Sequence, residues 1–133
     1  MKTILLSMSA MLLSFAAQAG SIDPAVAGAW KSTTPIAASP GITVFLGMNF
    51  KDSTAVMSSI CTYQDGQSQE ASVEVPVSVG AGKITVLAAG QNQNKEGGRD
   101  CNVSVEAGAV DYSIVGAVLR LSGGGNTLDF NRR

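Results

Sequence analysis

Histidine is absent from this sequence of 133 residues, and cysteine occurs only twice. Histidine is the most frequent general base and metal ligand in proteins, so its absence excludes most hydrolase triads and zinc sites. A serine nucleophile would need a lysine base, and Lys83 lies beside a turn on the polar side of a predicted strand. We find no motif for catalysis, a metal or a cofactor, and we expect that the protein is not an enzyme.

Charged residues are also scarce, and neither sign dominates. The chain has 9 lysines and arginines against 10 aspartates and glutamates, without a basic stripe. Nucleic acids and anionic membranes are held by clusters of positive charge, so neither is an expected partner. Gly80-Ala81-Gly82-Lys83 resembles the end of a phosphate-binding loop. However, Ile84 follows where the motif needs Ser or Thr, and the segment joins two predicted strands.

The first 19 residues have the three-part pattern of a cleavable export signal. Lys2 supplies the positive start, residues 4–17 form an apolar stretch, and Ala17-Gln18-Ala19 places small residues before the cleavage site. The stretch is shorter than the roughly 20 residues of a membrane-spanning helix. We therefore expect cleavage after Ala19 by a bacterial-type signal peptidase, and a single domain over residues 20–133 in the periplasm or outside the cell.

Cys61 and Cys101 both lie in the part that would be exported. In an oxidising compartment an isolated pair is most simply a disulfide. The chain-entropy model assigns about 3–4 kcal/mol to a link that closes a loop of this length. Two free thiols with a redox or metal-binding role are the alternative, but the chain has no Cys-x-x-Cys pair.

From Ile42 onward, apolar and polar residues alternate with the period of half-buried strands. The clearest strands are residues 42–50, 54–63 and 73–79, and similar segments continue to Arg132. Eight or nine antiparallel strands with short turns favour an all-β up-and-down barrel, and a two-sheet β-sandwich is the alternative. The strand that contains Pro76 is expected at an edge or with a bulge, because proline cannot donate a ladder hydrogen bond.

Two longer segments interrupt this pattern. Residues 31–41 (KSTTPIAASPG) form a first connection with two prolines, and residues 89–99 (AGQNQNKEGGR) are polar and rich in glycine. Lys95 and Arg99 lie near the tip of the second segment. Long loops are often functional, although both segments could equally be tolerated surface insertions.

Gly28-Ala29-Trp30, the long segment after it and a basic residue on the last strand form a combination that resembles the calycin superfamily of small lipocalin-like secreted barrels. The resemblance spans about residues 27–132 and implies that Trp30 and Arg132 close one end of the barrel. Arg132 alternates in phase with the apolar residues before it and can stack on a tryptophan, whereas Arg120 is out of phase. The sequence leaves open whether the barrel is hollow.

Two functional hypotheses follow. The first is an exported binding protein that holds a small apolar ligand in the barrel. The second is a protein-binding module, such as a periplasmic inhibitor of a protease or other hydrolase, that uses residues 20–24 or its loops. The long cysteine spacing differs from the short disulfide loop of inhibitors in this superfamily. Inward-facing residues that could line a ligand site, or equally an ordinary core, are Ile42, Val44, Met48, Met57, Tyr63, Tyr112 and Phe130, with Lys95 and Arg99 in a possible mouth loop.

Overall fold

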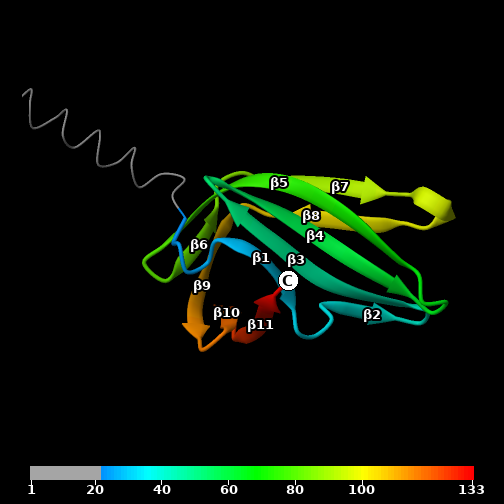
Figure 1. Cartoon of the computed structure of the whole chain (residues 1–133). Coiled ribbons are helices and arrows are strands. Elements are labelled where there is room, and N and C mark those ends of the chain that lie inside the picture. Colours follow the sequence, from blue (N-terminus) through cyan, green and yellow to red (C-terminus); the bar gives the residue numbers. More distant parts are fainter. Residues whose placement is uncertain (1–21) are drawn as a thin grey trace, which may run out of the picture.

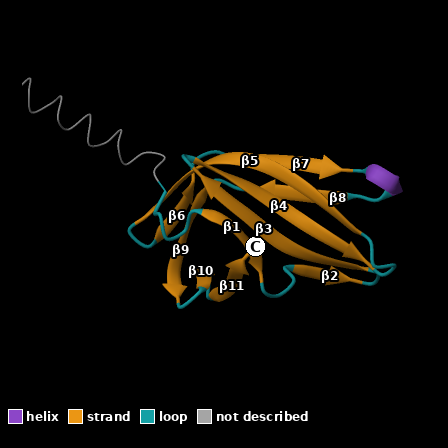
Figure 2. Cartoon of the chain, viewed as in Figure 1, coloured by secondary structure: helices purple, strands orange, loops and turns teal. Residues whose placement is uncertain are grey.

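The computed structural model describes residues 22–133, so the predicted export signal and its cleavage site lie outside the described residues. Strands make up most of this part of the chain (Figures 1 and 2). The elements are β1 (Gly28–Ser32), β2 (Ala37–Ser39), β3 (Ile42–Lys51), β4 (Thr54–Tyr63), β5 (Ser68–Gly80), β6 (Lys83–Val86), β7 (Gly90–Asn94), the 3-10 helix η1 (Glu96–Gly98), β8 (Cys101–Val105), β9 (Gly108–Val115), β10 (Val118–Gly123) and β11 (Asn126–Arg132).

Eight strands close into an antiparallel barrel in the order β1-β11-β10-β9-β6-β5-β4-β3, and β1 pairs with β3 to complete the ring. Strands that are neighbours in the sequence are mostly neighbours in the barrel, as the short turns predicted. The predicted all-β barrel is confirmed, and the sandwich alternative is not the fold. The β3–β4 pair keeps one register throughout, from Ile42 opposite Tyr63 to Lys51 opposite Thr54.

Three barrel strands run on beyond the ring and form an extension (Figure 1). β1 pairs only with residues 47–50 of β3, and β6 pairs only with residues 77–80 of β5. In the extension, β2 pairs with the outer edge of β3. The hairpin β7–β8, which forms a separate sheet, packs against β4 and β5 and completes the extension. The molecule therefore has two parts that share three strands, the barrel and this extension.

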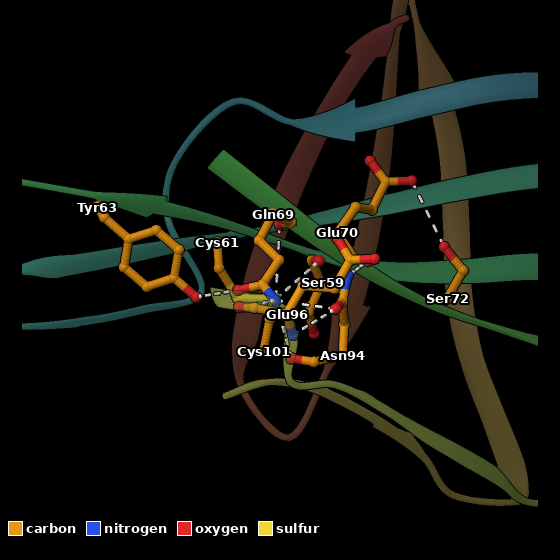
Figure 3. The surroundings of a disulfide bond; sticks show 9 residues. All are labelled: Ser59, Cys61, Tyr63, Gln69, Glu70, Ser72, Asn94, Glu96 and Cys101. Atoms are coloured by element: carbon orange, nitrogen blue, oxygen red, sulfur yellow. Dashed lines mark hydrogen bonds between the residues drawn. A yellow bond between two sulfur atoms is a disulfide. The ribbon is translucent and has the colours of Figure 1, made fainter. Parts of the chain in front are cut away.

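The predicted disulfide is confirmed. Cys61 on β4 is bonded to Cys101 on β8, and both residues are buried (Figure 3). Because β8 belongs to the hairpin and β4 to the barrel sheet, the bond links the hairpin covalently to β4. A buried structural disulfide is consistent with an oxidising compartment.

Residues 89–99, expected as a loop, contain β7 and η1 instead. β7 lacks the apolar alternation that marks a strand because two of its side chains form hydrogen bonds to β5 and do not pack in an apolar core. The Asn92 side-chain amide donates to the Ser72 carbonyl at 2.8 Å, and the Asn94 amide donates to the Glu70 carbonyl at 2.9 Å. These carbonyls lie on the part of β5 that is not paired with β6. Amide side chains thus bridge β7 to β5.

Pro76 also differs from expectation, because β5 lies between β4 and β6 and is not an edge strand of the barrel. Its register with β4 ends at Pro76, opposite Thr54, and its register with β6 begins at Val77. Proline therefore occupies the position at which the pairing of β5 with β4 ends and its pairing with β6 begins. At this position the missing N–H costs the fewest hydrogen bonds between strands.

Candidate functional site: an apolar barrel pocket

The segment that precedes β1 closes one end of the barrel. Ile22 forms a bridge with Val79, and the Asp23 N–H donates to the Val79 carbonyl at 2.9 Å. Val26 is fully buried, and its carbonyl accepts a 2.8 Å hydrogen bond from the Trp30 indole. The indole N–H is thereby satisfied inside an apolar environment, so Trp30 can be buried at low cost.

Arg132 lies over this closed end. Its guanidinium carbon is 4.0 Å from the centroid of the Trp30 ring, and its N–H groups donate to the carbonyls of Ala25 and Ala27. Arg120, the out-of-phase arginine, instead forms an ion pair with Asp129 at 2.8 Å. Gly28 makes the close approach possible, because a Cβ at this position would lie 2.9 Å from the Arg132 Nη1 atom.

A half-buried hydrogen bond fixes the segment before β1 to β9. The Tyr112 hydroxyl donates to an Asp23 carboxylate oxygen at 2.6 Å. This bond, with that from the Ala25 N–H, lowers the pKa of Asp23. Burial, followed by the hydrogen bond and charge of Asp23, raises the pKa of Tyr112 to about 12. Tyr112 therefore anchors the closed end and does not line the pocket described next.

An apolar pocket of about 350 Å³ lies at the open end of the barrel, further along the strands from the closed end, where the barrel meets the end of β8. On β3, Phe50 belongs to the closed end, and Met48 and Leu46 lead from it into the pocket. Met48 faces Met57 directly across the β3–β4 pair. The lining comprises Leu46, Met48, Met57, Ile84, Val86, Val105, Glu106, Ala107, Gly108, Ala109, Val110 and Leu121.

Residues 105–110, which run from the end of β8 into β9, form the lip of this pocket. Val110 is 37% exposed although it faces the same side as Ile84, its partner on β6. Side-chain carboxylate, amide and hydroxyl groups are confined to one residue of the lining, Glu106, which is exposed. The pocket can therefore bury an apolar group, and polar contacts are available only at its lip.

Two of the residues predicted to line a ligand site, Met48 and Met57, line this pocket. Phe130 is fully buried in the core, opposite Leu119. Ile42, Val44 and Tyr63 share the inner face of the sheet but lie in the extension. Lys95 and Arg99 differ from the expected mouth loop: both flank η1 at the tip of the hairpin (Figure 2) and do not line the pocket.

The sequence pattern missed Leu121, Val86 and the lip. Leu121 and Val86 were in phase with the predicted core, so their inward direction was visible in the alternation. What the alternation could not show is which end of the barrel the segment before β1 closes. That end is decided by Val26, Trp30 and Arg132, which come together from opposite ends of the described chain.

In comparisons with known proteins, no protein-family model matches the chain, and no curated protein or solved structure matches it either. The closed eight-stranded antiparallel barrel is compatible with a lipocalin-like fold. Among residues 22–133, no helix is long and apolar enough to cross a membrane. Within the same residues, no three His, Cys, Asp or Glu side chains are grouped so that they could hold a metal ion.

Proposed function

We propose that this protein is an exported, lipocalin-like binding protein of the calycin type, without enzymatic activity, that holds a small apolar molecule in the barrel pocket. The observation that supports this proposal is the pocket itself. A barrel closed at one end by Val26, Trp30 and Arg132 retains about 350 Å³ of apolar space behind an exposed lip. A barrel whose side chains filled its interior would have no such space.

The size of the pocket limits its ligand. Its volume lies near the lower end of the roughly 300–1,000 Å³ range of small-molecule sites. This space corresponds to about a dozen water molecules at roughly 30 Å³ each. Water in it would meet Met48, Met57 and Leu121 and few hydrogen-bond partners. An apolar ligand gains about 25 cal/mol for each Å² that it buries.

The charge at the lip narrows the ligand class further. Glu106 is the only charged residue in the lining, and the nearest basic side chain along β6, Lys83, is paired with Asp111 at 2.8 Å. A carboxylate on the ligand would face Glu106 without a compensating cation, and like charges repel. The preferred ligand is therefore an apolar molecule whose polar end is neutral or positively charged.

A fluorescent apolar probe tests this function. Protein purified from the extracytoplasmic fraction of cells that express the full chain is titrated with N-phenyl-1-naphthylamine, whose emission rises in apolar surroundings. Val110→Phe puts a larger side chain at the lip and is expected to weaken binding at least about tenfold, which is about 1.4 kcal/mol. Val115→Phe is the matched control, because Val115 lies on the same strand, is 50% exposed and does not line the pocket.

The proposal fails if the wild-type protein does not enhance probe emission, or if Val110→Phe and Val115→Phe bind equally well. Dodecylamine and dodecanoate then compete against the bound probe and report on the polar end. We expect the amine to displace it at lower concentration, and Glu106→Gln to reduce that preference. If the amine and the carboxylate displaced the probe equally well, the proposed preference for a neutral or positive polar end would be wrong, but ligand binding in the pocket would still stand.

The inhibitor hypothesis receives less support from the fold. Its N-terminal version needs a free segment at residues 20–24, but Ile22 and Asp23 are bonded to Val79, and Asp23 also binds Tyr112. A segment held at both of these residues closes the barrel and is not free to enter a partner's active site. Inhibition through the loops stays a prediction.

A further inference from the structure

A second depression lies at the tip of the extension and shares no residue with the barrel pocket. Its volume is about 310 Å³, and it is lined by Tyr63, Gln67, Ser68, Gln69, Glu96, Gly97 and Arg99. We call this depression the tip cleft. A more open hollow beside it shares Tyr63 and Arg99. In contrast to the barrel pocket, nearly every side chain of the tip cleft carries a hydrogen-bonding group.

The disulfide brings the walls of the tip cleft together. Tyr63 is two residues after Cys61 on β4, and Arg99 is two residues before Cys101 in extended backbone. Alternate residues of an extended chain lie on the same side, so the Cys61–Cys101 bond brings the two side chains face to face. The guanidinium carbon of Arg99 is 4.2 Å from the centroid of the Tyr63 ring.

A hydrogen-bond network then fixes the floor of the tip cleft. The Tyr63 hydroxyl donates to the Gln69 Oε1 atom at 2.6 Å, as Figure 3 shows. The Gln69 amide donates in turn to the Asn94 Oδ1 atom at 2.9 Å and to the Glu96 carbonyl at 3.2 Å. Because β4 and β5 each contribute one member and the hairpin contributes two, the cleft is preorganised before any ligand binds.

The positive charge of Arg99 in the tip cleft is neutralised by Asp65 beside it. Arg99 forms two hydrogen bonds to the Asp65 carboxylate, at 2.7 and 3.3 Å, which lower the pKa of Asp65 and raise that of Arg99. An anionic ligand would have to compete with Asp65 for this guanidinium. Of its five N–H donors, two are used by Asp65, so others remain for a ligand. Within residues 22–133, the side chains of Gln67, Ser68 and Glu96 form no hydrogen bond or ion pair.

We propose that the tip cleft binds a neutral saccharide. A sugar ring carries adjacent hydroxyls, each of which donates and accepts hydrogen bonds. Such a ligand can donate to the Glu96 carboxylate, accept from Arg99 and do both with Gln67 and Ser68, while its C–H face packs on a planar side chain. An apolar molecule would leave these groups unpaired, and a simple anion would face Glu96. The proposal is independent of ligand binding in the barrel.

The test is a ¹H–¹⁵N NMR titration of the mature protein with three neutral disaccharides: maltose, cellobiose and N,N′-diacetylchitobiose. Inorganic phosphate and glutamate serve as charged comparisons. We expect at least one disaccharide to shift the side-chain signals of Gln67, Gln69 and Arg99, with a dissociation constant of about 1 mM or below. The barrel-pocket signals of Val86 and Val110 should stay unchanged.

Variants at the rim show whether these contacts carry the binding. Glu96→Ala and Gln67→Ala are each expected to weaken it about three- to tenfold, as the loss of one ligand hydrogen bond would. Gln91→Ala, on the outer side of the same hairpin, is the control and should bind as the wild type does. The backbone amide signals of β7 and β8 in the same spectra verify that each variant keeps the hairpin folded. The proposal is overturned if no disaccharide shifts the cleft signals, if phosphate or glutamate shifts them as strongly, or if both rim variants bind unchanged.

Discussion

At the scale of single residues, the closed end of the barrel depends on Gly28. Its φ is +103°, a conformation that residues with a Cβ rarely adopt, and Arg132 Nη1 occupies the space that a side chain would need. The backbone freedom of glycine thus lets Arg132 reach the carbonyls of Ala25 and Ala27 and cover Trp30. The Gly-x-Trp pattern has this physical basis in the structure.

Gly28→Ala should therefore lower the free energy of unfolding by about 1–3 kcal/mol, the usual cost of a strained backbone position. Gly80→Ala is the matched control, because Gly80 has no atom within 4 Å of its ideal Cβ and is not at positive φ. That change should stay within about 0.5 kcal/mol of the wild type. Urea unfolding followed by Trp30 fluorescence measures both, and equal losses for the two variants would contradict the explanation.

The Tyr112–Asp23 hydrogen bond makes the closed end sensitive to pH at both extremes. The pKa of Asp23 is lowered by folding, so its contribution is present above about pH 4 and is lost as the pH falls through the folded-state value. The pKa of Tyr112 is raised to about 12, so its contribution is complete below about pH 10 and is lost between pH 10 and 12.

Tyr112→Phe should cost about 1–2 kcal/mol near neutral pH, because it removes a hydrogen bond to a charged group. The difference between this variant and the wild type should shrink as the pH rises from 10 to 12. Urea midpoints over this range provide the measurement. Tyr63→Phe is the comparison, since Tyr63 bonds to the neutral Gln69 side chain. If the Tyr112→Phe difference stayed constant up to pH 12, the assigned role of Tyr112 would be wrong.

At the scale of elements, the hairpin β7–β8 shows how far hydrophobic patterning reaches. Residues 42–50 and 54–63 were predictable as strands because one face of each is buried in the barrel. β7 was not, because Asn92 and Asn94 attach it to β5 through polar side chains. The barrel pocket was likewise predictable only in part. The inward direction of Met48 and Met57 followed from alternation, but the position of the lip depends on where β8 turns back into β9.

The double variant Asn92→Ala, Asn94→Ala should loosen the hairpin by about 2–4 kcal/mol, because two hydrogen bonds to β5 carbonyls and the bond from the Gln69 amide are lost. It should also increase self-association, since the edge of β5 would be left uncovered. Gln91→Ala, Gln93→Ala is the control: these residues alternate with the asparagines on the same strand and form no side-chain bond to β5 within the described residues. Amide exchange in β7 and β8 and light scattering report the two effects. Equal behaviour of both double variants would show that the amide bridges are dispensable.

At the scale of the whole molecule, the barrel and the extension share β3, β4 and β5 but are stabilised differently. Trp30, Phe50, Leu119 and Phe130 are buried in the barrel. The extension relies on the Cys61–Cys101 bond, the amide bridges and a smaller apolar contact around Val103. Small structures without a sufficient core commonly depend on a disulfide. Loss of the disulfide should therefore affect the two parts unequally.

Cys61→Ser, Cys101→Ser is expected to lower the free energy of global unfolding by about 3–4 kcal/mol, because the unfolded chain regains the entropy of the open loop. Under native conditions the hairpin should open at a lower free energy than the barrel, because β7 and β8 pair only with each other. The single tryptophan, Trp30, lies in the closed end and reports on the barrel alone. Amide exchange in β7 and β8 should therefore accelerate while Trp30 emission stays that of a buried indole. If the indole became exposed at the same rate, the barrel would depend on the extension for its stability, and the two parts would unfold as one cooperative unit.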